Sequence, residues 1–181
     1  MAERISRINL SISLVSIVIA GSALWLSYYQ GSLQKENYEI SIQPYLTVVP
    51  TINPEKKEYG YYIYNSGAGR GYIDKVEYYF DGILISGMNI EPLKKVAIKL
   101  GLDPNCLAYG NPRINDAISL DEMNKLLVLS SIAGIECKQT IDNLQQSIIL
   151  FQSRFTTKIW YRSLYNIKFM YDSASNIQTK I

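Results

Sequence analysis

Residues 8–29, INLSISLVSIVIAGSALWLSYY, form one uncharged apolar segment near the N-terminus, and they decide how the rest of the chain is interpreted. No charged residue lies between Arg7 and Lys35. A helix over residues 8–29 would rise about 33 Å, enough to cross a hydrocarbon core of about 30 Å. Aromatic rings, which favour the headgroup region, gather at its C-terminal end: Trp25, Tyr28 and Tyr29. The segment therefore predicts a transmembrane helix, with the lipid bilayer as a partner.

A cleaved signal peptide is the alternative for this segment. Arg4 and Arg7 would supply its positively charged n-region. However, Gly21-Ser22-Ala23 is a poor small-residue cleavage site, and the apolar run continues for six residues beyond it. We favour a retained anchor because the run is longer than an ordinary signal-peptide core.

Small or polar residues recur along one side of the expected helix. Their spacings are 4, 3, 4, 3 and 4 residues, a period of 3.5 that places them in one stripe. Helices in lipid associate through close packing of small residues and through Ser or Asn hydrogen bonds. We therefore expect the span to self-associate through this stripe. Its members are Asn9, Ser13, Ser16, Ala20, Ala23 and Ser27.

Two features bear on the side of the membrane that the remaining chain occupies. Arg4 and Arg7 precede the span, whereas only Lys35 follows within about 20 residues, so the positive-inside rule favours a cytoplasmic N-terminus and an external domain. A disulfide between Cys106 and Cys137 is expected in an extracytoplasmic domain, and two free thiols in a cytosolic one. The sequence leaves the side open.

Composition excludes several classes of function for the part beyond the span. Residues 1–37 hold three of the 18 basic and two of the 16 acidic residues, which leaves 15 against 14. Such a neutral domain has no electrostatic footprint for a nucleic-acid duplex. The chain has no histidine, so general acid–base catalysis and a Cys–His nucleophile both lack their usual residue. We predict a non-enzymatic protein with no catalytic residue, no metal and no cofactor.

Period-two patterns of aromatic and β-branched residues begin at Pro44 and predict a mainly β domain. The expected strands are Tyr45–Val49 (closed by Pro50), Tyr59–Tyr64, Gly71–Phe80, a return at Ile83–Ile85 after an Asp81-Gly82 turn, and one or two strands over Lys158–Tyr171. Helical spacing predicts helices over Glu91–Leu102 and Thr140–Phe155. Residues 103–119 are expected to form a loop. Ser119 and Glu122 have the spacing of a capping box, yet Lys125–Ser130 fits a helix or a strand.

The predicted fold is an N-terminal transmembrane helix followed by a β-sandwich-like α+β domain with two helical insertions. Its parts are a short tail at 1–7, the span at 8–29, a polar helical extension or linker at 30–43, the β-rich domain at 44–172 and a frayed tail at 173–181.

Three stretches of the chain resemble an uncharacterised bacterial family of single-span membrane proteins. Gln34–Leu46 is similar to an Asn-x-x-Ser-x-x-Pro stretch after the span, and Tyr62–Gly82 to an Asn-x-Gly-x-Gly-Pro-Ala hairpin. Ile159–Phe169 is similar to a closing Tyr-x-Ser-Ile-Tyr-Gly strand. Here Arg70-Gly71 replaces Pro-Ala, and Asn166 replaces the final Gly. The resemblance implies this architecture in a bacterial inner membrane and no particular activity. Because family members often carry basic residues just after the span, it favours a cytoplasmic domain.

Two places offer candidate ligand-binding residues. Arg70 lies in the only glycine-rich loop, Asn65–Gly71, where it would meet an anionic ligand or headgroup. In the closing strand, Tyr161, Ser163 and Tyr165 would share one face, backed by Arg162, and hold a polar ligand or the edge of a partner.

The sequence thus indicates a membrane-anchored protein that binds or senses an unknown protein or small anionic ligand. One alternative is a membrane effector of antiviral defence whose cytosolic domain binds an anionic signal such as a cyclic nucleotide. Another is an extracytoplasmic immunity or superinfection-exclusion protein.

Overall fold

The computed structural model describes residues 2–55, 58–130, 134–150 and 154–181 and divides the chain into two compact units, Met1–Ser41 and Ile42–Ile181. The first unit is the single helix α1 (Ala2–Ser41). Its portion Ser13–Ser41 is long and apolar enough to cross a membrane. Residues 30–43 were expected as a polar helical extension or a linker, and the helix continues through them without a break as far as Ser41.

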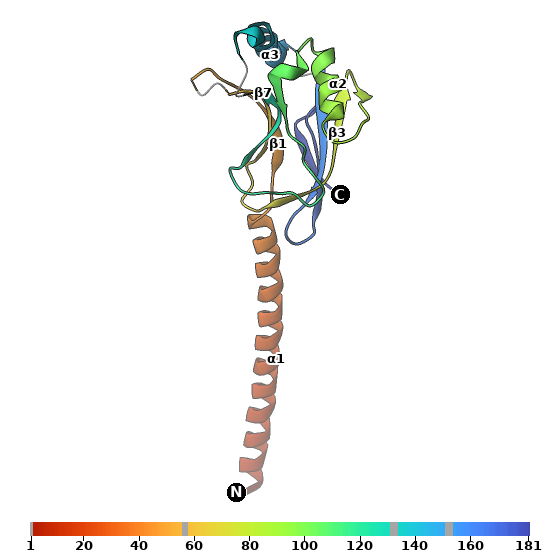
Figure 1. Ribbon diagram of the computed structural model, residues 1–181. Coiled ribbons are helices and arrows are strands. Elements are labelled where there is room, and N and C mark those ends of the chain that lie inside the picture. The colour runs from red at the N-terminus through yellow and green to blue at the C-terminus, as the bar shows by residue number, and fades with distance from the viewer. Residues whose placement is uncertain (1, 56–57, 131–133, 151–153) are drawn as a thin grey trace. The chain divides into compact units, whose positions relative to one another are not determined.

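The second unit contains two antiparallel sheets and two α-helices (Figure 1). Sheet A has the strand order β1-β2-β7-β5, and its strands are β1 (Leu46–Asn53), β2 (Glu58–Asn65), β5 (Leu107–Tyr109) and β7 (Met123–Leu129). Sheet B has the order β10-β9-β8-β3-β4, with β6 also paired to β3. Its strands are β3 (Gly71–Phe80), β4 (Ile83–Leu84), β6 (Ala117–Ile118), β8 (Phe155–Arg162), β9 (Lys168–Asp172) and β10 (Ile177–Lys180). The predicted mainly β, α+β fold class is confirmed.

Alternate residues of the strands build the core between the sheets. Tyr61 and Ile63 of β2 are buried, as are Ile159 and Tyr161 of β8. The Tyr61 ring meets the Phe155 ring edge-on, with centroids 5.2 Å apart. The period-two pattern is therefore the pattern of a sheet with one buried face.

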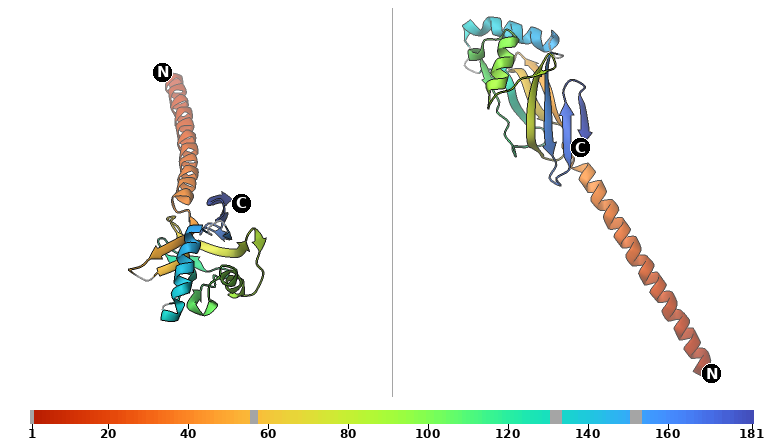
Figure 2. Two further views of the ribbon diagram at one scale, coloured as in Figure 1. Left: turned by 90° about the horizontal axis from the view of Figure 1, so that it is seen from above. Right: turned by 90° about the vertical axis from the view of Figure 1, so that its right-hand side faces the viewer.

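Helices α2 (Glu91–Lys99) and α3 (Lys138–Leu150) are the two insertions, and both lie at one end of the sandwich, away from the turn between β8 and β9 (Figure 2). Leu93 and Val96 of α2 are fully buried, as is Leu144 of α3. Short 3-10 turns, Pro104–Cys106 and Ile135–Cys137, carry the two cysteines, which form a disulfide with a Cα–Cα distance of 5.7 Å. The bridge ties the start of β5 to the start of α3.

Several boundaries differ from the sequence-based expectations. Pro50 does not close β1, because β1 is an edge strand and a proline is tolerated where the missing N–H faces away from the partner strand. The expected loop 103–119 contains the short strands β5 and β6. Helix α3 begins at Lys138 rather than Thr140, and Phe155 starts β8 instead of ending the helix.

The region after Ser119 is a turn into strand β7. The Ser119 N–H donates to a Glu122 carboxylate oxygen at 2.8 Å, which is one half of a capping box. Asp121 has a φ of 58°, in the left-handed region, so the backbone turns away from a helix.

The C-terminal segment does not fray as predicted at residues 173–181. Ile177–Lys180 forms β10 and pairs with β9, with Gln178 opposite Tyr171. The pairing extends sheet B by one strand, and its backbone hydrogen bonds hold a segment that was predicted to fray.

Candidate functional site

Tyr161, predicted as a ligand-binding residue, belongs to the interior of the domain. It is fully buried, and its hydroxyl accepts a hydrogen bond from the Leu46 N–H at 3.2 Å and donates one to Gln178. Burial raises the pKa of Tyr161 well above its ordinary value. The hydroxyl joins the two sheets and is not presented on the surface.

Ser163 stabilises the turn between β8 and β9. It is buried, and its Oγ accepts hydrogen bonds from the N–H groups of Tyr165 and Ile167, both at 3.2 Å. Asn166, in the same turn, has a φ of 62°, which explains a Gly or an Asn at this place. Tyr165 itself is exposed.

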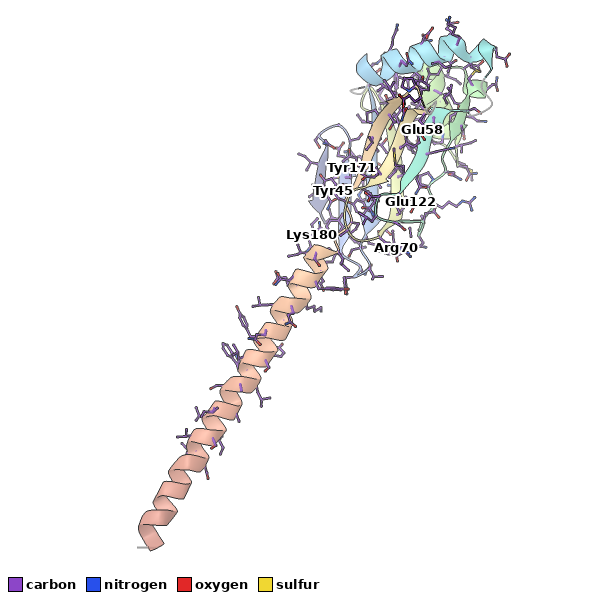
Figure 3. The ribbon with its side chains drawn as sticks, turned by 90° about the vertical axis from the view of Figure 1, so that its left-hand side faces the viewer. Tyr45, Glu58, Arg70, Glu122, Tyr171 and Lys180 are labelled. Atoms are coloured by element: carbon purple, nitrogen blue, oxygen red, sulfur yellow. A yellow bond between two sulfur atoms is a disulfide. The ribbon has the colours of Figure 1, made fainter. Side chains whose placement is uncertain are left out.

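The two candidate arginines lie on different elements. Arg162, on the outer face of sheet B, pairs with Asp74 and donates to Asn115, and its guanidinium lies 5.9 Å from the Tyr72 ring centroid. Arg70 is exposed in the 65–71 loop (Figure 3). The five predicted ligand-binding residues are therefore divided among the interior, a turn and two surfaces, and the structure does not assemble them into one site.

The glycine-rich loop is a turn that holds the beginning of the domain. The Asn65 side chain accepts from the Tyr45 and Gly67 N–H groups at 3.1 and 3.0 Å and donates to the Gly69 and Ile118 carbonyls at 2.8 and 2.9 Å. A Cβ at Gly69 would lie 1.7 Å from the Ile42 carbonyl oxygen, so only glycine fits there. The polar groups of the Asn65 side chain therefore bond to the backbone of the domain itself.

The predicted oligomerisation stripe lies on one side of α1. At 100° per residue its six positions fall within about 80° of the helix circumference. Trp25 and Tyr29 stack on the opposite side, with ring centroids 5.9 Å apart. The Asn9 side chain lies outside the described part of the structure.

The free edge of β1 is closed to pairing along Leu46–Pro50. The Leu46 N–H, which points away from β2, donates to the Tyr161 hydroxyl, and the Val48 backbone interacts with the Tyr171 hydroxyl. Pro50 occupies the next position with the same direction and has no N–H. Tyr45 and Tyr171 lie close together at this edge (Figure 3).

The free edge of β3 is open in the middle. At one end Ile73 exchanges backbone hydrogen bonds with the segment before β6, since its N–H donates to Asp116 and its carbonyl accepts from Asn115. At the other end the Tyr78 carbonyl accepts from the Ile85 N–H at 2.8 Å. Alternate residues of a strand direct their N–H and C=O groups to the same edge, and a bulge between Ile73 and Lys75 shifts this alternation by one residue. Counted from Tyr78, the Val76 groups therefore point into the interval between these anchors. Within the described residues, nothing pairs with them there.

Two cavities meet at this open edge, which we call the β3 notch. One cavity of about 360 Å³ is lined by Val76 and Tyr78, by Ser86 and Gly87 on one wall, and by Asn111 and Pro112 on the other. The second, of about 530 Å³, shares Asn111 and Pro112 and continues toward Asp116, Glu122 and Lys125. The two cavities therefore adjoin each other across one shared wall.

The charged residues that line the notch are mostly acidic. Glu77, Asp116 and Glu122 are the acidic residues and Lys125 is the basic residue among the lining of the two cavities, and Glu77 is already paired with Lys75. Lys75, 2.5 Å away, and the Tyr79 hydroxyl hold the pKa of Glu77 below its ordinary value. Over the described residues, no group of three His, Cys, Asp or Glu side chains could hold a metal ion.

The sequence contained one signal for the notch that the prediction of ligand-binding residues did not use. The expected return strand Ile83–Ile85 is much shorter than its ten-residue partner Gly71–Phe80, so it leaves the middle of the longer strand without a neighbour. Asn111 and Pro112, by contrast, reach the notch through tertiary contacts that no local pattern reveals.

No protein-family model, curated protein or solved structure matches this chain. The resemblance to single-span bacterial proteins therefore stays a prediction.

Proposed function

We propose that the chain is a single-pass protein of the bacterial cytoplasmic membrane, whose domain is extracytoplasmic and binds a partner without catalysing a reaction. The observation that carries this proposal is the Cys106–Cys137 disulfide. Both cysteines are buried, and disulfides of this structural kind persist in oxidising compartments and are rare in the cytosol. The charge asymmetry of Arg4 and Arg7 against Lys35 favours the same side.

The alternative of a cytosolic sensor for an anionic signal receives less support. It requires reduced cysteines and a cluster of available cations, whereas Arg162 is engaged by Asp74 and Asn115, and Arg154 by Asp81. An extracytoplasmic immunity or exclusion protein lies on the proposed side of the membrane and is one specialised form of the binding function.

A non-enzymatic role agrees with the state of the acidic groups near the notch. Glu77 has a lowered pKa because Lys75 and Tyr79 stabilise its ionised form, so it is poorly suited to donate a proton near neutral pH. Binding is the function that the notch supports best.

Thiol trapping in expressing cells tests the side of the membrane. Cells are quenched in acid, and the protein is denatured in the presence of a membrane-permeant maleimide so that buried free thiols are also blocked; it is then reduced and labelled with a PEG-maleimide. We expect Cys106 and Cys137 to resist the first reagent and to react after reduction. A Met88→Cys variant, at an exposed position, should react with an impermeant maleimide in intact cells. Native cysteines that are fully blocked before reduction, or a Met88→Cys variant that is labelled only after permeabilisation, would contradict the proposal.

Self-association of the span is a separate part of the proposal and has its own test. Ser16→Cys lies in the stripe. Val18→Cys lies on the opposite side of the helix, about 180° from the centre of the stripe, and serves as a control at nearly the same depth. We expect oxidative crosslinking in membranes for Ser16→Cys and several-fold less for Val18→Cys. Equal crosslinking, or none for either variant, would remove the stripe as an assembly surface.

A further inference from the structure

We infer that the β3 notch binds an extended peptide segment, which adds as a short strand between β4 and β6 and presents an apolar residue to Val76 and a basic residue to Asp116 and Glu122. The inference rests on the proposed binding function and names its ligand class. It is carried by the unpaired strand edge, the cavity beneath it and the acidic lining.

The strand edge supplies the backbone recognition. Val76 offers one N–H donor and one C=O acceptor that the described structure leaves without a partner on this side. The complement of such a pair is a peptide backbone in the extended conformation. Ile73 and Tyr78, whose outward groups are already paired, lie opposite Tyr161 and Thr157 of β8. A bulge at Ile73–Lys75 places them four strand steps apart, so the interval is about 13 Å, which is room for three residues.

The direction of the ligand follows from the neighbouring strands. Both β4 and β6 run antiparallel to β3, so a segment between them continues their line when it is also antiparallel. Such a segment runs from the Ile85 end of the notch toward the Asp116 end. Its residue opposite Val76 directs its side chain to the same face as Val76, since cross-strand neighbours share a face.

The cavity favours an apolar side chain at that position. Val76 packs against the core, and Tyr78, Leu84, Ile85 and Pro92 line the same volume of about 360 Å³. A charged residue directed here would be desolvated without a partner, which is costly.

Charge complementarity favours a basic residue on the C-terminal side of the apolar one. Glu77 is paired with Lys75, so the two carboxylates Asp116 and Glu122, which lie in the cavity at the Asp116 end, exceed Lys125 by one charge. A Lys or Arg directly after the apolar position therefore meets a negative potential.

The edge of β1 is not an alternative docking strand. Its first three outward positions are closed by the Tyr161 hydroxyl, the Tyr171 hydroxyl and the Pro50 ring, so a peptide would find no free N–H along Leu46–Pro50.

The test uses the full chain in nanodiscs, labelled with ¹⁵N, and the tripeptide acetyl-Thr-Val-Lys-amide, whose length matches the interval. We expect saturable shifts of the amide signals of Val76 and of its wall residues Ser86 and Asn111, with a dissociation constant of about 1 mM. Methylation of the peptide's valine nitrogen should weaken binding about tenfold, because one hydrogen bond is lost. Replacing the valine by aspartate should abolish binding, and replacing the lysine by glutamate should weaken it about fivefold.

Protein variants make the site assignment independent of the peptide series. Val76→Pro removes the N–H that points into the notch while leaving the β8 ladder intact, and Asn111→Trp fills the cavity from its opposite wall. Both should lose binding. Thr179→Trp, exposed on β10, introduces the same ring elsewhere and should bind normally. If Val76→Pro does not fold, Asn111→Trp decides the question.

The inference is overturned if the methylated peptide binds as well as its parent, if Asn111→Trp binds normally, or if the parent peptide gives no saturable shift at Val76. Failure here, with trapped cysteines oxidised in cells, would leave the extracytoplasmic binding protein standing without this ligand. Binding at the notch together with reduced cysteines would instead retain the peptide site and remove the proposed side of the membrane.

Discussion

Two strand edges of the same sandwich differ in whether their backbone groups have partners: the edge of β1 is blocked and the edge of β3 is open. At β1, a tyrosine hydroxyl accepts the Leu46 N–H and a proline removes the donor at position 50. At β3, the flanking strands β4 and β6 are two residues long each and leave the Val76 groups between them unpaired in the described structure. Open edges invite unwanted strand pairing, and folded proteins ordinarily block them. This contrast, together with the cavity beneath the open edge, is why we assign the binding of a partner to β3.

The largest expected effect concerns a third edge, that of β5, which the disulfide holds. Replacing both Cys106 and Cys137 with alanine should destabilise the domain by about 2–4 kcal/mol, because the bridge closes a loop of 31 residues. Chemical denaturation with and without reductant measures this. Unchanged stability would mean that packing alone holds β5 and α3 in place.

A smaller effect is expected when the blocked edge is opened. Tyr161→Phe keeps the ring but leaves the buried Leu46 N–H unpaired, which should cost about 1–3 kcal/mol. Tyr72→Phe, on the outer face, keeps its ring next to Arg162 and should change stability by less than about 0.5 kcal/mol. Equal losses in the two variants would show that the Tyr161 hydroxyl does not matter for the edge.

The smallest effect is the pH dependence of the blocked edge. Burial raises the pKa of Tyr161 and Tyr171 above the ordinary 10.0, so the folded domain retains both phenolic protons to higher pH than the unfolded chain does. Their contribution to stability is complete below the unfolded pKa of 10.0 and is lost as the pH rises from there through the folded pKa. Melting temperatures between about pH 8 and about pH 11 should fall less steeply in Tyr161→Phe than in the parent chain. A parallel decline would place the titrating groups elsewhere.

Local patterns predicted the elements that local forces determine. The strand Gly71–Phe80 and its Asp81-Gly82 turn follow from alternation and from residues that tolerate positive φ, and both have the expected bounds. The prediction that residues 173–181 fray was wrong because their pairing with β9 is a tertiary contact. The prediction that the first strand ends before Pro50 was wrong because edge strands tolerate proline.

The candidate site was harder to predict because polar residues in a strand have several uses. Tyr161, Ser163 and Arg162 were selected as exposed recognition groups, yet each satisfies a polar group of its own domain. The notch depends instead on what is missing beside Val76, a valine without distinctive chemistry. Absence of a neighbouring strand is a property of the assembled sheet and not of any motif.

Amide hydrogen exchange on the full chain tests the contrast between the two edges most directly. The account predicts that the Val76 N–H exchanges about a hundredfold faster than the Leu46 N–H, and that, of these two amides, the tripeptide slows exchange at Val76 alone. Equal protection of the two amides in the free protein, or a Val76 amide that the bound peptide leaves unprotected, would contradict it.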